Sequence, residues 1–245
     1  MKQLLKPGIH WLFIFFPVAF VLEHQHANAP LVFFSAAISI VPIARQISQA
    51  TENLATYTGE AVGGLLNATF GNLPELIIAI VALRAGLHEM VLASLAGAIL
   101  ANMLLATGVS FLVGGIKYHE QDYNSTSIRV YCSMMLIAVI SLTIPSGFHI
   151  ISGQKVPANE NTLNLYLAVV LLVGYILYLF FMIKTHPDFF KSKEGGQSED
   201  HGHAWPIWRA LTTLVGASVL TAFASEVLVG AAEQTGESLG MSSAF

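Results

Sequence analysis

The most regular feature of this chain is a series of long apolar runs separated by short polar connections. A helix needs about 20 mainly apolar residues to cross the hydrocarbon core of a bilayer, and fewer when flanking residues reach the interface. The runs predict seven membrane-spanning helices, at residues 9–22, 30–48, 61–83, 89–115, 128–147, 163–183 and 207–230. We therefore expect an all-α membrane protein.

The connection at 184–206 is the only segment that looks soluble. The orientation of the spans is set by the basic residues at their ends. Cytoplasmic loops retain Lys and Arg. With the N-terminus inside, nine of the 11 basic residues fall at cytoplasmic ends, and only Arg84 and Lys155 fall outside. We expect the N-terminus and the 184–206 linker in the cytoplasm, and the membrane to be a bacterial-type plasma membrane or that of an organelle.

Composition supports lipid as the solvent of this chain. Of its 245 residues, 54% are hydrophobic and 11% are charged, against about 25% charged in an ordinary soluble domain. The net charge is −4, and no basic patch is interleaved with aromatic residues, so nucleic acid is not an expected partner. The single cysteine, Cys132, can form no disulfide within the chain.

Glu75 is the charged residue that the pattern places closest to the middle of a span. An ionised carboxylate there costs about 2.5–3.5 kcal/mol on insertion scales, which indicates a functional role. Pro74 lacks an N–H, so the carbonyl of Phe70 loses its helical partner, and Gly71 loosens the same turn. We expect an interrupted helix that presents carbonyl oxygens, the Asn72 amide and the carboxylate together, as calcium prefers. The alternative is a proline kink with a glutamate paired to a neighbouring helix.

Small residues in the 89–115 span predict a close helix contact. They form two adjacent rows at four-residue spacing, Ala93, Gly97 and Ala101 in one and Ser94, Ala98 and Asn102 in the other. Such rows let helix backbones approach one another. Asn102 would then face a neighbouring helix, either as a hydrogen-bonding group between helices or as part of an ion site.

Two stretches of the chain repeat the same order of features. Ala-Thr-Glu-Asn-Leu at 50–54 corresponds to Ala-Ser-Glu-Val-Leu at 224–228, and Thr-Gly-Glu at 58–60 corresponds to Thr-Gly-Glu at 235–237. The second and seventh spans are five steps apart, an odd number, so the two copies cross the membrane in opposite directions. That is typical of an inverted-topology repeat. We expect Glu52 and Glu226 at opposite membrane faces, flanking the entrances to one pathway for protons and cations.

The segment 63–76, Gly-Gly-Leu-Leu-Asn-Ala-Thr-Phe-Gly-Asn-Leu-Pro-Glu-Leu, resembles the calcium/proton exchangers, a branch of the calcium/cation antiporter superfamily. The resemblance implies a direct cation and proton ligand in Glu75, a backbone ligand in the Gly71 carbonyl, and supporting polar groups in Asn72 and Asn102. It covers nearly the whole chain and divides it into a leading transmembrane helix and loop at 1–28, a first five-helix repeat at 29–183, the cytoplasmic linker at 184–206, and the start of an inverted second repeat at 207–245.

Two departures from this family pattern are visible. Many relatives carry serine where Ala98 stands, so no hydroxyl can come from that position. The family also has a second Gly-Asn-x-x-Glu motif, which the repeat offset would place near position 252. We therefore expect that a single copy of these 245 residues cannot transport, and that they are part of a chain of about 360 residues.

The function implied is exchange of calcium, or a similar divalent cation, for protons, without an enzymatic step or a cofactor. Calcium, protons and membrane lipid are the expected partners, and a homo-oligomer is left open. One alternative is a sodium/calcium exchanger of the same fold. Another is a non-transporting metal-sensing or assembly subunit, which would use His201 and His203 in the linker. An intramembrane protease is not indicated, because neither a His-Glu-x-x-His helix nor a nucleophile elbow occurs in the sequence.

Overall fold

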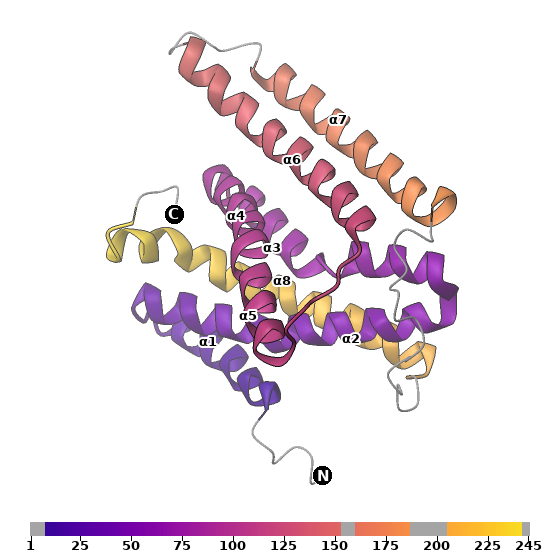
Figure 1. The fold of residues 1–245 in the computed structure, drawn as a ribbon. Helices are drawn as coiled ribbons and strands as arrows, with labels where there is room; N and C mark the ends of the chain where they lie inside the picture. The colour runs from indigo at the N-terminus through magenta and orange to yellow at the C-terminus, as the bar shows by residue number, and fades with distance from the viewer. Residues whose placement is uncertain (1–7, 153–159, 187–204, 242–245) are drawn as a thin grey trace. The chain divides into compact units, whose positions relative to one another are not determined.

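The computed structural model describes residues 8–152, 160–186 and 205–241, and every regular element in these ranges is helical (Figure 1). In chain order the elements are the 3-10 helix η1 (Ile9–Ile14), α1 (Phe15–His24), α2 (Ala29–Phe70), α3 (Leu73–Arg84), α4 (His88–Leu100), the π-helix η2 (Ala101–Ala106), α5 (Thr107–Lys117), α6 (Ser125–Ser152), α7 (Glu160–Phe180), the π-helix η3 (Phe181–Thr185) and α8 (Ile207–Ser238). The chain forms two compact units, residues 1–120 with 203–245, and residues 121–202.

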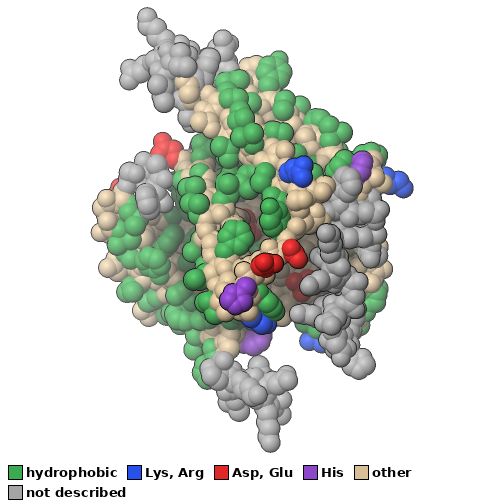
Figure 2. Space-filling view, viewed as in Figure 1, with side chains coloured by type: hydrophobic (Ala, Val, Ile, Leu, Met, Phe, Trp, Pro, Cys, Tyr) green, Lys and Arg blue, Asp and Glu red, His purple; other side chains and the backbone are tan. Residues whose placement is uncertain are grey.

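Among the described residues, five helices are long and apolar enough to cross a membrane, and a shorter apolar helix covers Ile9–His24. The five are Ala29–Thr58, His88–Lys117, Ser125–Pro145, Thr162–Thr185 and Ile207–Ser238. Large apolar side chains lie exposed along these helices, and hydrophobic groups cover much of the face seen in Figure 2. An exposed apolar surface of this extent would not be stable in water. The all-α membrane class expected from the sequence is therefore confirmed.

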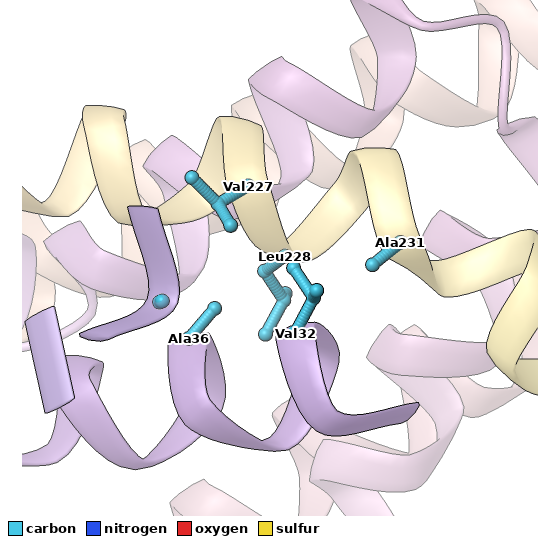
Figure 3. Packing of buried hydrophobic residues seen from close by; sticks show 6 residues of the cluster. Val32, Ala36, Val227, Leu228 and Ala231 are labelled. Atoms are coloured by element: carbon cyan, nitrogen blue, oxygen red, sulfur yellow. The ribbon is translucent and has the colours of Figure 1, made fainter. Parts of the chain in front are cut away.

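The core of the first unit is the pair formed by α2 and α8. Val32 and Ala36 of α2 pack against Val227, Leu228 and Ala231 of α8, and their side chains face one another in Figure 3. The first residues of α2 therefore lie beside the last third of α8. The start of α8 lies much further along α2, near Asn53.

Two hydrogen bonds join Trp205, two residues before α8 begins, to α2. The Trp205 backbone N–H donates to Oδ1 of Asn53 over 2.9 Å, and the Tyr57 hydroxyl donates to the Trp205 carbonyl over 2.8 Å. Since Val32 lies beside Leu228 while Asn53 lies beside Trp205, the two helices run antiparallel. Opposite directions are what an inverted repeat requires of these two spans.

Small and hydroxylated residues allow α2 and α8 to pack closely. Ser39 and Thr51 on α2 and Thr221 and Ser225 on α8 are fully buried. Each hydroxyl donates to a carbonyl three or four residues earlier in its own helix, at 2.7–2.9 Å. The helices therefore meet across small side chains without leaving a polar group unpaired, as in other membrane helix pairs.

The last third of α2 turns back instead of continuing straight. A Cβ built on Gly63 would lie 3.1 Å from the Ala55 Cβ, whereas eight residues of straight helix separate two positions by about 12 Å. The ribbon of α2 accordingly reverses direction before it reaches α3 (Figure 1). The expected end of the second span at residue 48 is wrong, because the helix continues through residue 58.

The second unit is a pair of helices, α6 and α7. The rings of Tyr131 on α6 and Tyr178 on α7 are tilted, with their centroids 6.3 Å apart. Both helices present mostly apolar side chains at the surface of this unit. They correspond to the spans expected at 128–147 and 163–183.

Candidate cation-binding pocket

The third expected span, 61–83, is divided into two helical pieces at Gly71 and Asn72. Helix α2 ends at Phe70, and α3 begins at Leu73 with Pro74 in its first turn. Asn72 has φ −103° and ψ 17°, outside the helical region. Because Pro74 has no N–H to donate to the Phe70 carbonyl, the helical hydrogen-bond ladder stops here. The interruption expected from the sequence is present.

Glycine at position 71 is required by a close backbone approach. The Gly71 N–H donates to the Asn67 carbonyl over 2.9 Å, and a Cβ at position 71 would lie 2.5 Å from that same oxygen. No larger residue fits without moving the chain. The close turn brings Gly71 next to the first turn of α3, which carries Glu75.

A pocket of about 490 Å³ opens between α2 and this break. Five of its lining residues come from α2 and three from the break and α3, namely Ala44, Arg45, Ser48, Gln49, Glu52, Gly71, Pro74 and Glu75. The α2 members fall at helical spacing, so they form one face of that helix. Two carboxylates, a hydroxyl, a side-chain amide and the backbone at Gly71 thus converge on one hollow.

The pocket lies close to the middle of the long antiparallel pair. The membrane-crossing part of α2, Ala29–Thr58, has 30 residues and is about 45 Å long at 1.5 Å per residue. Ala44 and Arg45 are at its centre. Phe70 and Leu73, on either side of the break, pack against the buried cluster that contains Ile43 and Ile47. The break and Glu75 are therefore held beside the centre of α2.

Glu75 also benefits from its place in α3. It belongs to the first helical turn, where unpaired N–H groups and the helix dipole favour negative charge. Glu52 enters from the opposite wall of the pocket, two turns along α2 from Arg45. Both carboxylates are exposed to the hollow rather than enclosed by protein.

The sequence did not reveal that Arg45 belongs to this pocket. The basic-residue count assigns Arg45 to the cytoplasmic end of a span that ends at residue 48, whereas the helix continues past that residue and Arg45 lies halfway along Ala29–Thr58. The available signal was the row Arg45, Ser48, Gln49 and Glu52, whose spacing of three, one and three residues puts four polar side chains on one helical face.

The other expected site residues do not line the pocket. Asn72 forms part of the break itself, as the residue preceding α3. Asn102 lies exposed in η2, where its carbonyl accepts a hydrogen bond from the Thr107 hydroxyl over 3.0 Å. A π-helical segment inside a longer helix often marks a functional position. A Cβ on Gly97, in the expected small-residue row, would meet nothing within 4 Å, so the close approach expected there is not found within the first unit.

Glu226 is exposed on α8, far from the pocket along the antiparallel pair. Its neighbours Val227 and Leu228 pack near Val32, while Glu52 is next to Asn53, which contacts Trp205. Glu52 and Glu226 thus lie toward opposite ends of the pair. The membrane face that each carboxylate meets stays a prediction.

The donor set of the pocket fits a hard cation better than a transition metal. The described residues contain no cluster of three or more His, Cys, Asp or Glu side chains that could hold a metal ion. The pocket instead offers oxygen atoms of several kinds, which calcium accepts in a flexible arrangement. His201 and His203, proposed as a linker metal site, lie outside the described residues.

Comparison with known proteins identifies close relatives. The family model described as sodium/calcium exchanger protein matches residues 28–184. A Ca(2+)/H(+) antiporter of Aphanothece halophytica is 34% identical, over 96% of this chain and 66% of its own length. The Ca(2+)/H(+) antiporter ChaA of Bacillus subtilis is 34% identical, over 94% of this chain and 65% of its own length. Vacuolar cation/proton exchanger 3 of Oryza sativa is 34% identical, over 97% of this chain and 59% of its own length.

A solved structure shares the same arrangement of helices. The structure of native YfkE matches with a TM-score of 0.72 and 30% identity, covering 95% of this chain and 65% of the YfkE chain. The chain thus spans roughly two thirds of the length of these relatives.

Proposed function

Because this chain is a member of the sodium/calcium exchanger family, in its calcium/proton exchanger branch, we propose that it acts in the exchange of calcium, or a similar divalent cation, for protons across a membrane. The observation that carries this proposal is the pocket beside the centre of α2, which Glu52 and Glu75 both line together with the backbone at Gly71. The relatives named as Ca(2+)/H(+) antiporters support the choice of ions.

The chemistry rests on competition for the same oxygen atoms. A carboxylate can hold a proton or coordinate a cation, and a metal ion binds only the deprotonated form. Arrival of a divalent cation therefore releases protons, and protonation releases the cation. Coupled exchange then follows when the pocket opens to one membrane face at a time, with no covalent intermediate.

In this scheme Glu75 is the central ligand for cation and proton, and the Gly71 carbonyl adds a backbone oxygen. Glu52, Ser48 and Gln49 supply further oxygen atoms from α2. Asn72 and Asn102 act as supporting polar groups, and Glu226 lines the pathway toward the opposite face. Calcium takes six to eight oxygen ligands, so we propose that water or a further protein segment completes the shell.

The finer topology also belongs to this proposal. The excess of basic residues at one set of span ends supports a cytoplasmic N-terminus and a cytoplasmic 184–206 linker. The linker would then lie on the same side as the start of α8, next to Asn53 and Tyr57.

Calcium binding to the purified chain tests the proposal directly, because binding needs only the pocket. Radioactive calcium retained at equilibrium should saturate, and lowering the pH should displace it. Glu75→Gln should abolish retention, while Glu23→Gln, an exposed carboxylate at the end of α1, should leave it unchanged. Full retention by Glu75→Gln at equal protein folding would reject the site.

A sodium/calcium exchanger is the alternative that the matched family model names in its description. Calcium binding to the same protein separates the two alternatives when protons and sodium ions are added in turn as competitors. We expect protons, and not sodium, to displace the bound calcium. Displacement by sodium alone would assign the chain to the alternative.

A further inference from the structure

Arg45 is a permanently charged side chain at the centre of a helix that crosses the membrane. It lies halfway along Ala29–Thr58, with mainly apolar and small residues before it on α2 and a more polar stretch, 46–53, after it. An arginine keeps its charge in proteins, and at membrane depth it is found facing a polar interior with a partner of opposite charge. The carboxylates available to it are those of its own pocket.

Two carboxylates line the same pocket as this guanidinium. Arg45 and Glu52 are seven residues apart on the same face of α2, and Glu75 approaches from α3 on the other wall. The remaining lining residues are uncharged. With both glutamates ionised, the formal charge of the lining is −1 rather than −2.

We propose that Arg45 is the resident counter-cation of the pocket, competing with an incoming divalent cation for Glu52 and Glu75 and thereby keeping the bound ion weakly held and releasable. The identity of that ion rests on the proposed function above, whereas the presence of Arg45 and two carboxylates in one pocket does not. Arg45 is a positioning residue in this role, because it acts on the ion through the glutamates.

The charge balance predicts the direction in which loss of Arg45 should change the affinity for a divalent cation. A divalent cation bound to two carboxylates alone is neutralised, but with Arg45 present the same complex carries a net +1 charge. Replacing Arg45 by a neutral residue should therefore tighten divalent binding. A purely structural arginine would have the opposite effect, because its loss would loosen the pocket and weaken binding.

Calcium binding to the full chain is measured for the wild type, Arg45→Gln and Arg45→Lys. Arg84→Gln is the matched control, since Arg84 is an exposed arginine at the end of α3, outside the pocket. Arg45→Gln should lower the Kd for calcium at least about tenfold, in line with the one to three pK units by which a neighbouring charge changes proton binding. Arg45→Lys and Arg84→Gln should stay within about twofold of the wild type. An unchanged or raised Kd in Arg45→Gln would overturn the proposal.

A second measurement needs no calcium. Thermal unfolding is followed in chelator for Arg45→Gln, Glu52→Gln, Glu75→Gln and the two double variants that combine Arg45→Gln with either glutamine. Arg45→Gln should lower the Tm when both glutamates are present and lower it less, or raise it, when one of them is already glutamine. Equal Tm shifts in all backgrounds would mean that Arg45 does not pair with these carboxylates, and would overturn the proposal.

The two measurements separate failure of this inference from failure of the proposed function. If Arg45 couples to the glutamates but neither the wild type nor Arg45→Gln binds calcium, the calcium assignment is rejected while the counter-cation pairing stands. If calcium binds to the wild type and the Tm shifts are additive, the calcium assignment stands and Arg45 has no counter-cation role. Should Arg45→Gln fail to fold, the same cycle is run with Arg45→Lys as the reference and Arg45→Met as the neutral variant.

Discussion

Glu52 and Glu75 line the same pocket, although they belong to different helices and are 23 positions apart in the sequence. Two carboxylates facing one hollow can share protons or jointly hold a divalent cation, whereas a single carboxylate would leave such an ion poorly neutralised. The pocket therefore offers a divalent cation more than one glutamate on a broken helix would.

The first prediction concerns this pairing. Glu52→Gln should weaken calcium binding about tenfold or more, because the pocket loses one of its two negative charges while its volume is kept. The Glu52→Gln/Glu75→Gln double variant should bind no better than Glu75→Gln alone. Equilibrium calcium retention checks both, and wild-type affinity in Glu52→Gln would place Glu52 outside the binding site.

The second prediction concerns the close turn at Gly71. Gly71→Ala should reduce the free energy of unfolding by about 1–3 kcal/mol, the usual cost of forcing extra atoms into a tight site, because its Cβ would meet the Asn67 carbonyl oxygen. It should also weaken calcium binding by shifting the backbone that lines the pocket. Gly97→Ala is the matched control, since a Cβ there meets nothing within 4 Å, and an equal loss in both variants would contradict the steric argument.

The third prediction concerns the connection between the pocket helix and the start of α8. Asn53 accepts from the Trp205 N–H and donates through Nδ2 to the Gln49 carbonyl over 2.7 Å, so one side chain links the pocket wall to α8. Asn53→Ala should lower the free energy of unfolding by about 1–3 kcal/mol, because the Trp205 N–H loses its partner. Gln234→Ala, exposed on α8, should change it by less than about 0.5 kcal/mol. Similar Tm values for both variants would show that the link adds nothing.

The local chemistry of the break could be predicted from the sequence, but the composition of the pocket could not. A missing N–H at Pro74 acts on a carbonyl four residues away, so the interruption near Gly71 follows from covalent structure alone. Arg45 and Glu52 required knowledge of how far α2 continues. Hydropathy ended that span at residue 48 because the next residues are polar, yet those residues remain helical.

The reason lies in tertiary packing that hydropathy does not measure. Thr51 is fully buried, and its hydroxyl donates to the Ile47 carbonyl. The Asn53 side chain accepts a hydrogen bond from the Trp205 N–H. Polar residues that are satisfied in this way can stay within a membrane helix. Hydropathy therefore assigns Glu52 to the end of a helix. In the structure α2 continues beyond Glu52, and this residue lies in the pocket wall.

The last prediction tests the inverted repeat through Glu52 and Glu226. The antiparallel pair puts Glu52 beside the start of α8, where Asn53 contacts Trp205, and puts Glu226 beside the start of α2, where Leu228 packs near Val32. Because α2 and α8 are both long and apolar enough to cross the membrane, residues toward opposite ends of the pair should meet opposite aqueous faces. Cys132→Ser first removes the single native thiol, and then Glu52→Cys and Glu226→Cys are introduced separately. In sealed, uniformly oriented vesicles, an impermeant thiol reagent should label one variant only from outside and the other only after permeabilisation. Labelling of both from the same side would contradict the opposed orientation, and with it the assignment of these two carboxylates to the two ends of one pathway.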